Sequence, residues 1–409
     1  MSLKKNIIGL GVAQLFNYLL PFIQFPYLTR VLGTEYFGLI MYACSIIVML
    51  QVITDYGLEI YLTKKITDRN IGNKHIGKYL TQSFFLKICL ILFISPLFLL
   101  VYINTKFENY PMATIFIYLT VIVNAFNPLW IYQGLEKTYV YARVVILFKI
   151  ISLFFVFIFV KNESDYVLYL ILFFLNSFFV NFVLYFWVFF KIKVTPKKIK
   201  KIEIVELVKG SFEYFISRAG ATLYVTGCSV FLGTFSSLQQ VALYTSAEKL
   251  YIAGCGVFAP VITAFIPYMN RTKNYKLFYK VTFFVFILSL VGVIIGIYFG
   301  GDIIKIIFGE SLILAKNTLN ILLLALVFNI MGMMFGYPAL MPIGLVKHAN
   351  LSVIFSGLIQ LVLFISIILI NIPLTSFNVA ITFLISTIFT FLYRLLFFVK
   401  YKNITIKAK

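Results

Sequence analysis

The sequence predicts an all-α polytopic membrane protein with about 12 transmembrane helices, arranged as two six-helix lobes around a central cavity. Hydrophobic residues fill 62% of the 409 positions and charged residues only 12%, far from the balance of a soluble domain. The apolar residues form stretches close to the length that crosses a bilayer, and short links join them. Continuous apolar runs such as 90–101 lack the alternation of barrel strands, so the spans are expected to be helices.

Each span is placed on an apolar run, because a helix needs about 20 such residues to cross the hydrocarbon layer. In chain order we expect spans at 7–28, 38–58, 79–102, 113–132, 144–160, 167–190, 211–232, 241–265, 281–299, 319–337, 351–370 and 379–399. Lys4 and Lys5 before the first run resemble the start of a signal peptide, but the run is long and no small-residue cleavage site follows it. It is therefore expected to remain as the first span.

The basic residues of the links orient these spans. If the N-terminus is cytoplasmic, the inside links hold 25 Lys and Arg residues and the outside links hold five. This asymmetry predicts that both termini are cytoplasmic. The net charge of +21 is then explained by topology and by attraction to anionic lipid, so nucleic acid is not an expected partner.

The reactive side chains give no sign of a metal, a cofactor or an enzyme active site. Cys44, Cys89, Cys228 and Cys255 all fall inside spans without the spacing of metal ligands. His75 and His348 stand alone in links. No cofactor is therefore expected, and coupling to a proton or sodium gradient stays open.

The chain divides into two halves at its most basic link. We expect an N-terminal lobe at 1–190, a basic cytoplasmic linker at 191–209 and a C-terminal lobe at 210–409. Two short segments recur at corresponding links: LGT at 32–34 and 232–234, and Gly-Leu-x-Lys at 134–137 and 344–347. Parallel six-helix repeats facing one another would leave a cavity suited to alternating access.

Polar side chains inside the spans are the candidate site residues, because a charge at the centre of a lipid-facing helix costs about 2.5–3.5 kcal/mol. Basic groups in a wet cavity would suit a phosphate or pyrophosphate, and amides and hydroxyls would suit sugar hydroxyls. We expect Arg218, Lys249, Arg30 and Lys87 at the anion, Gln14, Asn17, Gln24, Asn124 and Thr222 at the sugars, and Asp55 or Glu248 as the ion-coupling group.

Structural explanations compete with these assignments. Amide and hydroxyl side chains can join helices to one another. Asp55 and Glu59 could pair with nearby Lys64 or Lys65. Lys149 and Arg394 lie close enough to the cytoplasmic ends of their spans to extend to the headgroups.

Several short segments resemble the bacterial polysaccharide exporters called Wzx-type flippases, whose superfamily also holds the multidrug and toxic-compound extruders and the peptidoglycan-precursor flippases. They are NYLLP (17–21), PYL (26–28), RVLG (30–33), DYG (55–57), WIYQGLEK (130–137), Ser217-Arg218 and YTSAEK (244–249). The resemblance extends over residues 17–249, and beyond them it is mainly topological. It implies a fold like that of the multidrug extruders.

The resemblance also implies a function. The expected cargo is an undecaprenyl-pyrophosphate-linked oligosaccharide such as an O-antigen repeat unit, turned over from the cytoplasmic to the outer leaflet of the bacterial inner membrane. Polysaccharide polymerase and chain-length machinery would be partners of such a transporter. Two alternatives stay open: a multidrug or metabolite extruder of the same fold, and a polytopic O-antigen polymerase or ligase. The latter generally needs a large outer loop, and the longest outside link here is 300–318.

Overall fold

The computed structural model describes the backbone of residues 3–67 and 73–407, and the side chains of residues 20–67 and 75–402. All elements within these ranges are helices, as the composition predicts. The chain forms two compact units, Met1–Ala219 and Gly220–Lys409. The boundary between the units falls inside helix α8 (Lys201–Phe235), which begins within the segment that the sequence predicts to be a linker.

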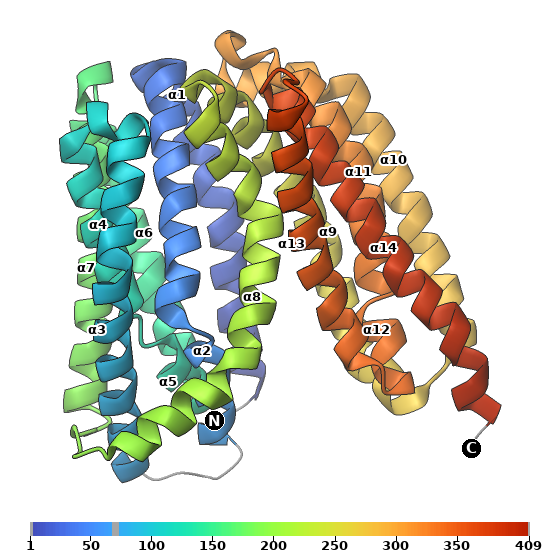
Figure 1. Cartoon of the computed structure of the whole chain (residues 1–409), viewed down its shortest axis with the longest axis horizontal. Coiled ribbons are helices and arrows are strands. Elements are labelled where there is room, and N and C mark those ends of the chain that lie inside the picture. The colour runs from blue at the N-terminus through green and yellow to red at the C-terminus, as the bar shows by residue number, and fades with distance from the viewer. Residues whose placement is uncertain (1–2, 68–72, 408–409) are drawn as a thin grey trace. The chain divides into compact units, whose positions relative to one another are not determined.

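The first unit contains seven helices before α8 in the described residues, with two short 3₁₀ helices between them (Figure 1). They are α1 (Leu3–Asp55), α2 (Leu58–Thr67), α3 (Asn73–Asn104), η1 (Lys106–Asn109), α4 (Pro111–Ala125), α5 (Leu129–Gly134), α6 (Thr138–Phe159), η2 (Glu163–Asp165) and α7 (Tyr166–Phe190). Helices α4 and α6 both pack against α1 and α7, so these long helices form one bundle.

The second unit is built around α11. Its elements after α8 are α9 (Leu238–Thr272), α10 (Tyr275–Phe308), η3 (Glu310–Leu312), α11 (Ala315–Met334), α12 (Tyr337–Leu340), η4 (Met341–Ile343), α13 (Val346–Leu369) and α14 (Ser376–Lys407). Helix α11 packs against α9, α10 and α14, and α13 packs against α14. The side chains of α11 are correspondingly among the most buried of this unit.

Gly33 divides α1 into two spans. At about 1.5 Å per residue, the 53 residues of α1 would extend about 80 Å, far more than a bilayer requires. Gly33 interrupts the helix with φ 70° and ψ 177°, a conformation that glycine adopts at little cost. The described residues hold 11 helices that are long and apolar enough to span, the first of which contains this break. The expectation of about 12 spans is confirmed.

Both units repeat one pattern of broken helices. Helix α4 ends before Pro128 and short α5 follows; α11 ends before Pro338, and short α12 and η4 follow. These prolines are 210 positions apart, the offset found between the two Gly-Leu-x-Lys segments. The second long helix after each break, α7 in one unit and α14 in the other, begins at Tyr166 or Ser376, again 210 positions apart. Proline lacks a backbone N–H and restricts the preceding residue, which explains why both spans break there.

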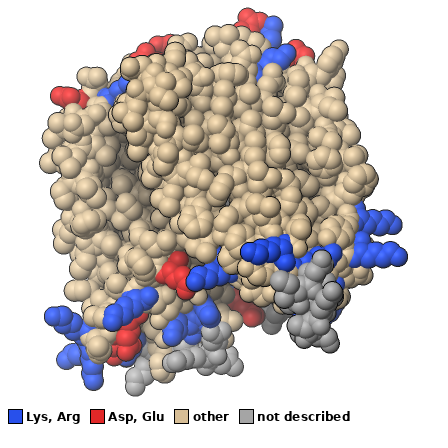
Figure 2. Space-filling model, turned by 45° about the vertical axis from the view of Figure 1, so that its right-hand side comes forward, with Lys and Arg blue, Asp and Glu red and all other residues tan. Residues whose placement is uncertain are grey.

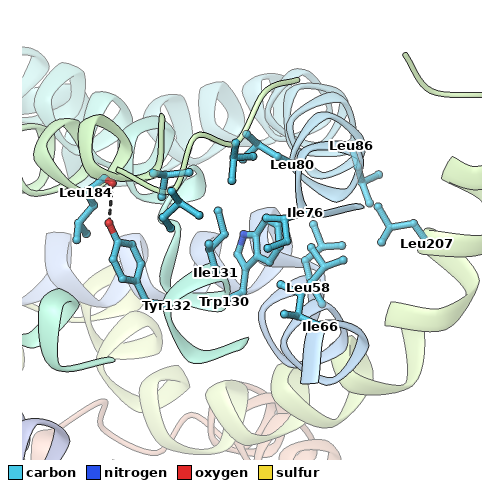
Figure 3. Close-up of a cluster of buried hydrophobic side chains, with 14 of the residues drawn as sticks. Leu58, Ile66, Ile76, Leu80, Leu86, Trp130, Ile131, Tyr132, Leu184 and Leu207 are labelled. Carbon is cyan, nitrogen blue, oxygen red and sulfur yellow. Dashed lines mark hydrogen bonds between the residues drawn. The ribbon is translucent and has the colours of Figure 1, made fainter. Parts of the chain in front are cut away.

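A buried apolar cluster fixes α5 inside the first unit (Figure 3). The Trp130 side chain is 1% exposed and lies among Leu58 and Ile66 of α2 and Ile76 of α3. The Tyr132 hydroxyl donates a 2.6 Å hydrogen bond to the carbonyl of Leu184 on α7. The short helix thus holds α2, α3 and α7 together.

The distribution of charge agrees with a membrane protein. On the face drawn in Figure 2, uncharged side chains form a wide band, and the Lys, Arg, Asp and Glu side chains lie at its margins. Large apolar side chains such as Leu92, Phe154 and Ile294 are more than 60% exposed. In water such exposure would be unfavourable, whereas in a bilayer these side chains meet lipid.

Candidate functional site

Arg218 joins α8 to two acidic residues at the corner between α1 and α2. Its Nη1 atom donates to Oδ2 of Asp55 at 3.1 Å and to Oε2 of Glu59 at 2.8 Å. The side chains of Arg218, Asp55 and Glu59 are 39%, 20% and 24% exposed. Solvent therefore screens the two ion pairs only in part. A guanidinium held by two carboxylates in a membrane-spanning unit is a candidate binding site for ions.

The turn between α1 and α2 brings these acids to α8. Tyr56 and Gly57 both have positive φ, 49° and 72°, which lets the chain reverse direction sharply. A Cβ atom on Gly57 would lie 2.7 Å from the backbone nitrogen of Phe215 and 2.7 Å from the carbonyl oxygen of Ser211. The Tyr56 ring stacks on the Phe215 ring, with centroids 4.8 Å apart. Only glycine permits this approach, which sets Asp55 and Glu59 beside Arg218.

Gln133 holds the other oxygen of Glu59. Its Nε2 atom lies 3.5 Å from Oε1 of Glu59, and its Oε1 atom accepts a 3.1 Å hydrogen bond from the Thr63 hydroxyl. Helix α5 approaches α2 closely here, since a Cβ atom on Gly134 would lie 2.8 Å from Cβ of Ile66. Sequence reasoning missed Gln133 as a partner of the site, although it stands in the WIYQGLEK segment.

Lys87 of α3 completes a cluster that we call the charged cluster: Asp55, Glu59, Lys87 and Arg218. The Lys87 side chain is buried, with 2% of the residue exposed, and it interacts electrostatically with the other three. The two bases and the two acids of this cluster balance in formal charge. The alternative partners Lys64 and Lys65 are also incorrect for Asp55 and Glu59, which pair with Arg218.

The remaining expected residues of the first unit lie away from this pairing. Arg30 is exposed, and its Nη1 atom donates to the carbonyl of Pro26 in the preceding turn. Gln24 is half-buried on α1 and Asn124 is half-buried at the end of α4. Gln14 and Asn17 lie outside the described side chains.

The other candidates belong to the second unit. Glu248 is buried on α9 and interacts electrostatically with the neighbouring Lys249, which is half-buried. Thr222 is half-buried on α8. The roles of these residues in binding stay predictions.

Arg394 does not extend to the headgroups as the sequence predicts. Its Nε atom donates to the Ser352 hydroxyl at 2.8 Å, and its Nη1 atom donates to the Gly332 carbonyl at 2.8 Å. Nη2 also donates to the Ala349 carbonyl. The side chain therefore turns into the second unit and joins α14 to α11 and α13, a structural role.

Comparison with known proteins relates the chain to transporters. It is 26% identical over 310 residues to a Shigella dysenteriae protein named "Putative O-antigen transporter", covering 75% of this chain and 78% of the relative. A protein of the same name from Escherichia coli K12 is 27% identical over 281 residues, covering 66% of each chain.

Two solved structures share the fold. An inward-facing multidrug resistance transporter of the MATE family matches with a TM-score of 0.70 and 16% identity, over 97% of this chain and 99% of its own. The inward closed lipid II flippase MurJ matches with a TM-score of 0.67 and 16% identity, over 95% of this chain and 87% of its own. The expected extruder-like fold is confirmed.

A family match settles the relationship at the level of sequence. Residues 3–273, more than half of the chain, match the family described as "Polysaccharide biosynthesis protein". The matched range includes every member of the charged cluster, together with Gln133 and Lys249. The chain therefore belongs to the polysaccharide biosynthesis protein family.

Proposed function

We propose that this protein flips an undecaprenyl-pyrophosphate-linked oligosaccharide, such as an O-antigen repeat unit, from the cytoplasmic to the outer leaflet of the bacterial inner membrane by alternating access. The family, the names of the two relatives and the flippase fold support this function. Both termini would be cytoplasmic.

The observation that carries the proposal is the partly exposed Arg218 guanidinium, held by carboxylates inside a membrane-spanning unit. Arginine offers a planar, bidentate donor for phosphate oxygens, and Lys87, which interacts electrostatically with Arg218, would add a second charge. Arg218 and Lys87 would bind the diphosphate in the first unit, and Lys249 would bind it in the second. Arg30 would contact the cargo at the outer exit.

The balanced charge of the cluster bears on coupling. With both acids ionised, Asp55 and Glu59 occupy Arg218 and cancel the two bases, so the cluster has little net attraction for an anion. Neutralising either acid with a proton, or screening it with sodium, would leave a net positive charge. Asp55 therefore remains the proposed coupling group, now together with Glu59, and Glu248 is its counterpart in the second unit. Gln14, Asn17, Gln24, Asn124 and Thr222 would meet the sugar hydroxyls.

The test is complementation of a strain that lacks the gene, with surface polysaccharide as the readout and membrane abundance of the protein as the control. Wild-type protein should restore the polysaccharide. Arg218→Ala should abolish export at unchanged abundance, because it removes the guanidinium, and Arg218→Lys should retain part of the export. Full surface polysaccharide with Arg218→Ala would refute the site assignment.

The shared fold with a multidrug transporter favours an extruder as the second candidate. The same deletion strain separates the two functions. A flippase predicts lost surface polysaccharide with an unchanged drug-resistance profile. Increased drug sensitivity with normal polysaccharide would support the extruder instead.

A further inference from the structure

An apolar groove lies between α3 and α4 of the first unit, away from the charged cluster. Its volume is about 480 Å³, within the range of pockets that hold small ligands. The residues that line it are Ser95, Phe98, Leu99, Tyr102, Pro111, Thr114, Ile115, Tyr118 and Leu119. Helix α3, and α4 together with α5, are long and apolar enough to span, so the groove lies at membrane depth.

Three of the hydroxyl groups that line the groove, those of Ser95, Thr114 and Tyr118, already have hydrogen-bond partners. The Phe98 and Tyr118 rings stack with centroids 4.9 Å apart, and the Ser95 and Tyr118 hydroxyls share a 2.5 Å hydrogen bond. The Thr114 hydroxyl donates to backbone carbonyls. The walls include Leu99 and Ile115, which are 55% and 51% exposed. An apolar chain fits such a surface, because these three hydroxyls keep their partners when the chain covers them.

The groove adjoins the face of α3 that carries Lys87 and shares Phe98 with it. Lys87, Ile94 and Phe98 stand at i, i+7 and i+11, which places them on one stripe of the helix, and all three are buried. Ser95, at one end of the groove, is eight residues from Lys87, or about 12 Å along the axis. At about 100° per residue, Ser95, Leu99 and Tyr102 turn about 60–120° from Lys87. Helix α3 thus carries a basic group that interacts with Arg218 and, farther along and to one side, an apolar groove.

We propose that this groove binds the polyprenyl chain of the transported lipid while the diphosphate occupies the charged cluster. The proposal rests on the proposed function and adds a place for the tail of the cargo. A polyprenyl lipid has a single chain, which matches a single groove, whereas a phospholipid has two. Stacked aromatic rings at the floor would contact the methyl-branched chain.

The experiment uses full-length protein in nanodiscs with two photoreactive probes, a polyprenyl diphosphate and a phosphatidylethanolamine, each carrying the reactive group on its chain. Mass spectrometry locates the adducts. We expect the polyprenyl probe to label residues 95–119, and excess unlabelled polyprenyl diphosphate to compete this labelling away. Equal labelling of the groove by phosphatidylethanolamine, without competition, would overturn the proposal.

A matched pair of variants separates a specific site from general lipid contact. Ile115→Trp fills the groove from an exposed position, and Ile158→Trp places the same side chain on α6 at a position that is 56% exposed. The first should lower polyprenyl labelling several-fold, and the second should leave it unchanged. Equal effects of the two would contradict a site in the groove. Melting temperature and gel filtration verify that both variants are folded.

The outcomes also distinguish this proposal from the proposed function. Suppose that the polyprenyl probe labels wild-type protein only outside residues 95–119, and that the Ile115→Trp variant still exports polysaccharide. The groove is then excluded and the flippase function stands. If the probe binds nowhere on the wild type, the proposed function fails together with the groove.

Discussion

The Nη1 atom of Arg218 on α8 lies 2.8 Å from Oε2 of Glu59 on α2, across 159 residues of sequence. The same nitrogen contacts Asp55, so one guanidinium joins the corner between α1 and α2 to α8. Gln133 contacts the other oxygen of Glu59. Three segments of the family resemblance, DYG with its following helix, WIYQGLEK and Ser217-Arg218, therefore meet at one site.

Arg218 and Glu59 should be coupled in stability. A double-mutant cycle with Arg218→Ala and Glu59→Gln should give a coupling free energy of about 1 kcal/mol, because the bond is charge-assisted but partly exposed. The measurement is unfolding of the purified protein in detergent. The exposed pair Lys305 and Glu310 is the control and should show no measurable coupling, although its nitrogen and oxygen lie 2.5 Å apart. No coupling between Arg218 and Glu59 would contradict the geometry.

Gly57→Ala should destabilise the protein. Alanine at φ 72° costs about 1–2 kcal/mol, and its Cβ atom would meet the backbone of α8. Gly292→Ala on α10 is the control, because a Cβ atom there meets nothing within 4 Å. The first variant should melt at a lower temperature than wild type and the second at an equal or higher one. Equal melting of both would mean that the close approach to α8 is absent.

Gln133→Leu should reduce export without reducing abundance. Loss of the amide leaves Glu59 with one fewer donor, at a cost of about 1 kcal/mol, and frees the carboxylate to move relative to Arg218. Surface polysaccharide per molecule of membrane protein is the readout. Gln239→Leu, at an exposed position on α9, is the control and should export normally. Equal export by both variants would remove Gln133 from the site.

The orientation can be tested by labelling single cysteines after the four native ones are replaced by alanine. Asn162 and Lys197 are both exposed in links, one before α7 and one after it. With cytoplasmic termini, Asn162→Cys should react with a membrane-impermeant maleimide in intact cells, and Lys197→Cys should react only after permeabilisation. The reverse pattern would invert the topology.

The membrane spans could be predicted from the sequence because lipid imposes one requirement along the whole chain: apolar runs of sufficient length with satisfied backbones. The finer breaks could not. Residues 113–132 read as one span, but the structure ends α4 at Ala125 and starts α5 at Leu129. Pro128 was the available signal for this break. Gly33, by contrast, falls in the link that the sequence places between the spans at 7–28 and 38–58, and the structure breaks α1 at this position.

The members of the charged cluster were predicted better than their pairing. Arg218, Lys87 and Asp55 stand out because charges inside spans are costly. Their partners depend on contacts between helices that are distant in sequence, and the nearby Lys64 and Lys65 were misleading alternatives for Asp55 and Glu59. Gln133 was inside a recognised segment, but an amide gives no signal of its own until the fold places it beside Glu59.

Transport in reconstituted vesicles tests the central claim most directly. Full-length protein is placed in liposomes with a fluorescent undecaprenyl-pyrophosphate-linked oligosaccharide, and the fraction of the oligosaccharide exposed to an added glycosidase is followed over time. Wild-type protein should make nearly all of the oligosaccharide accessible to the glycosidase within the assay. Arg218→Ala should leave the accessible fraction at the level of protein-free vesicles. Two results would contradict the account. In one, vesicles with wild-type protein expose no more oligosaccharide than protein-free vesicles. In the other, vesicles with Arg218→Ala expose as much as vesicles with wild-type protein.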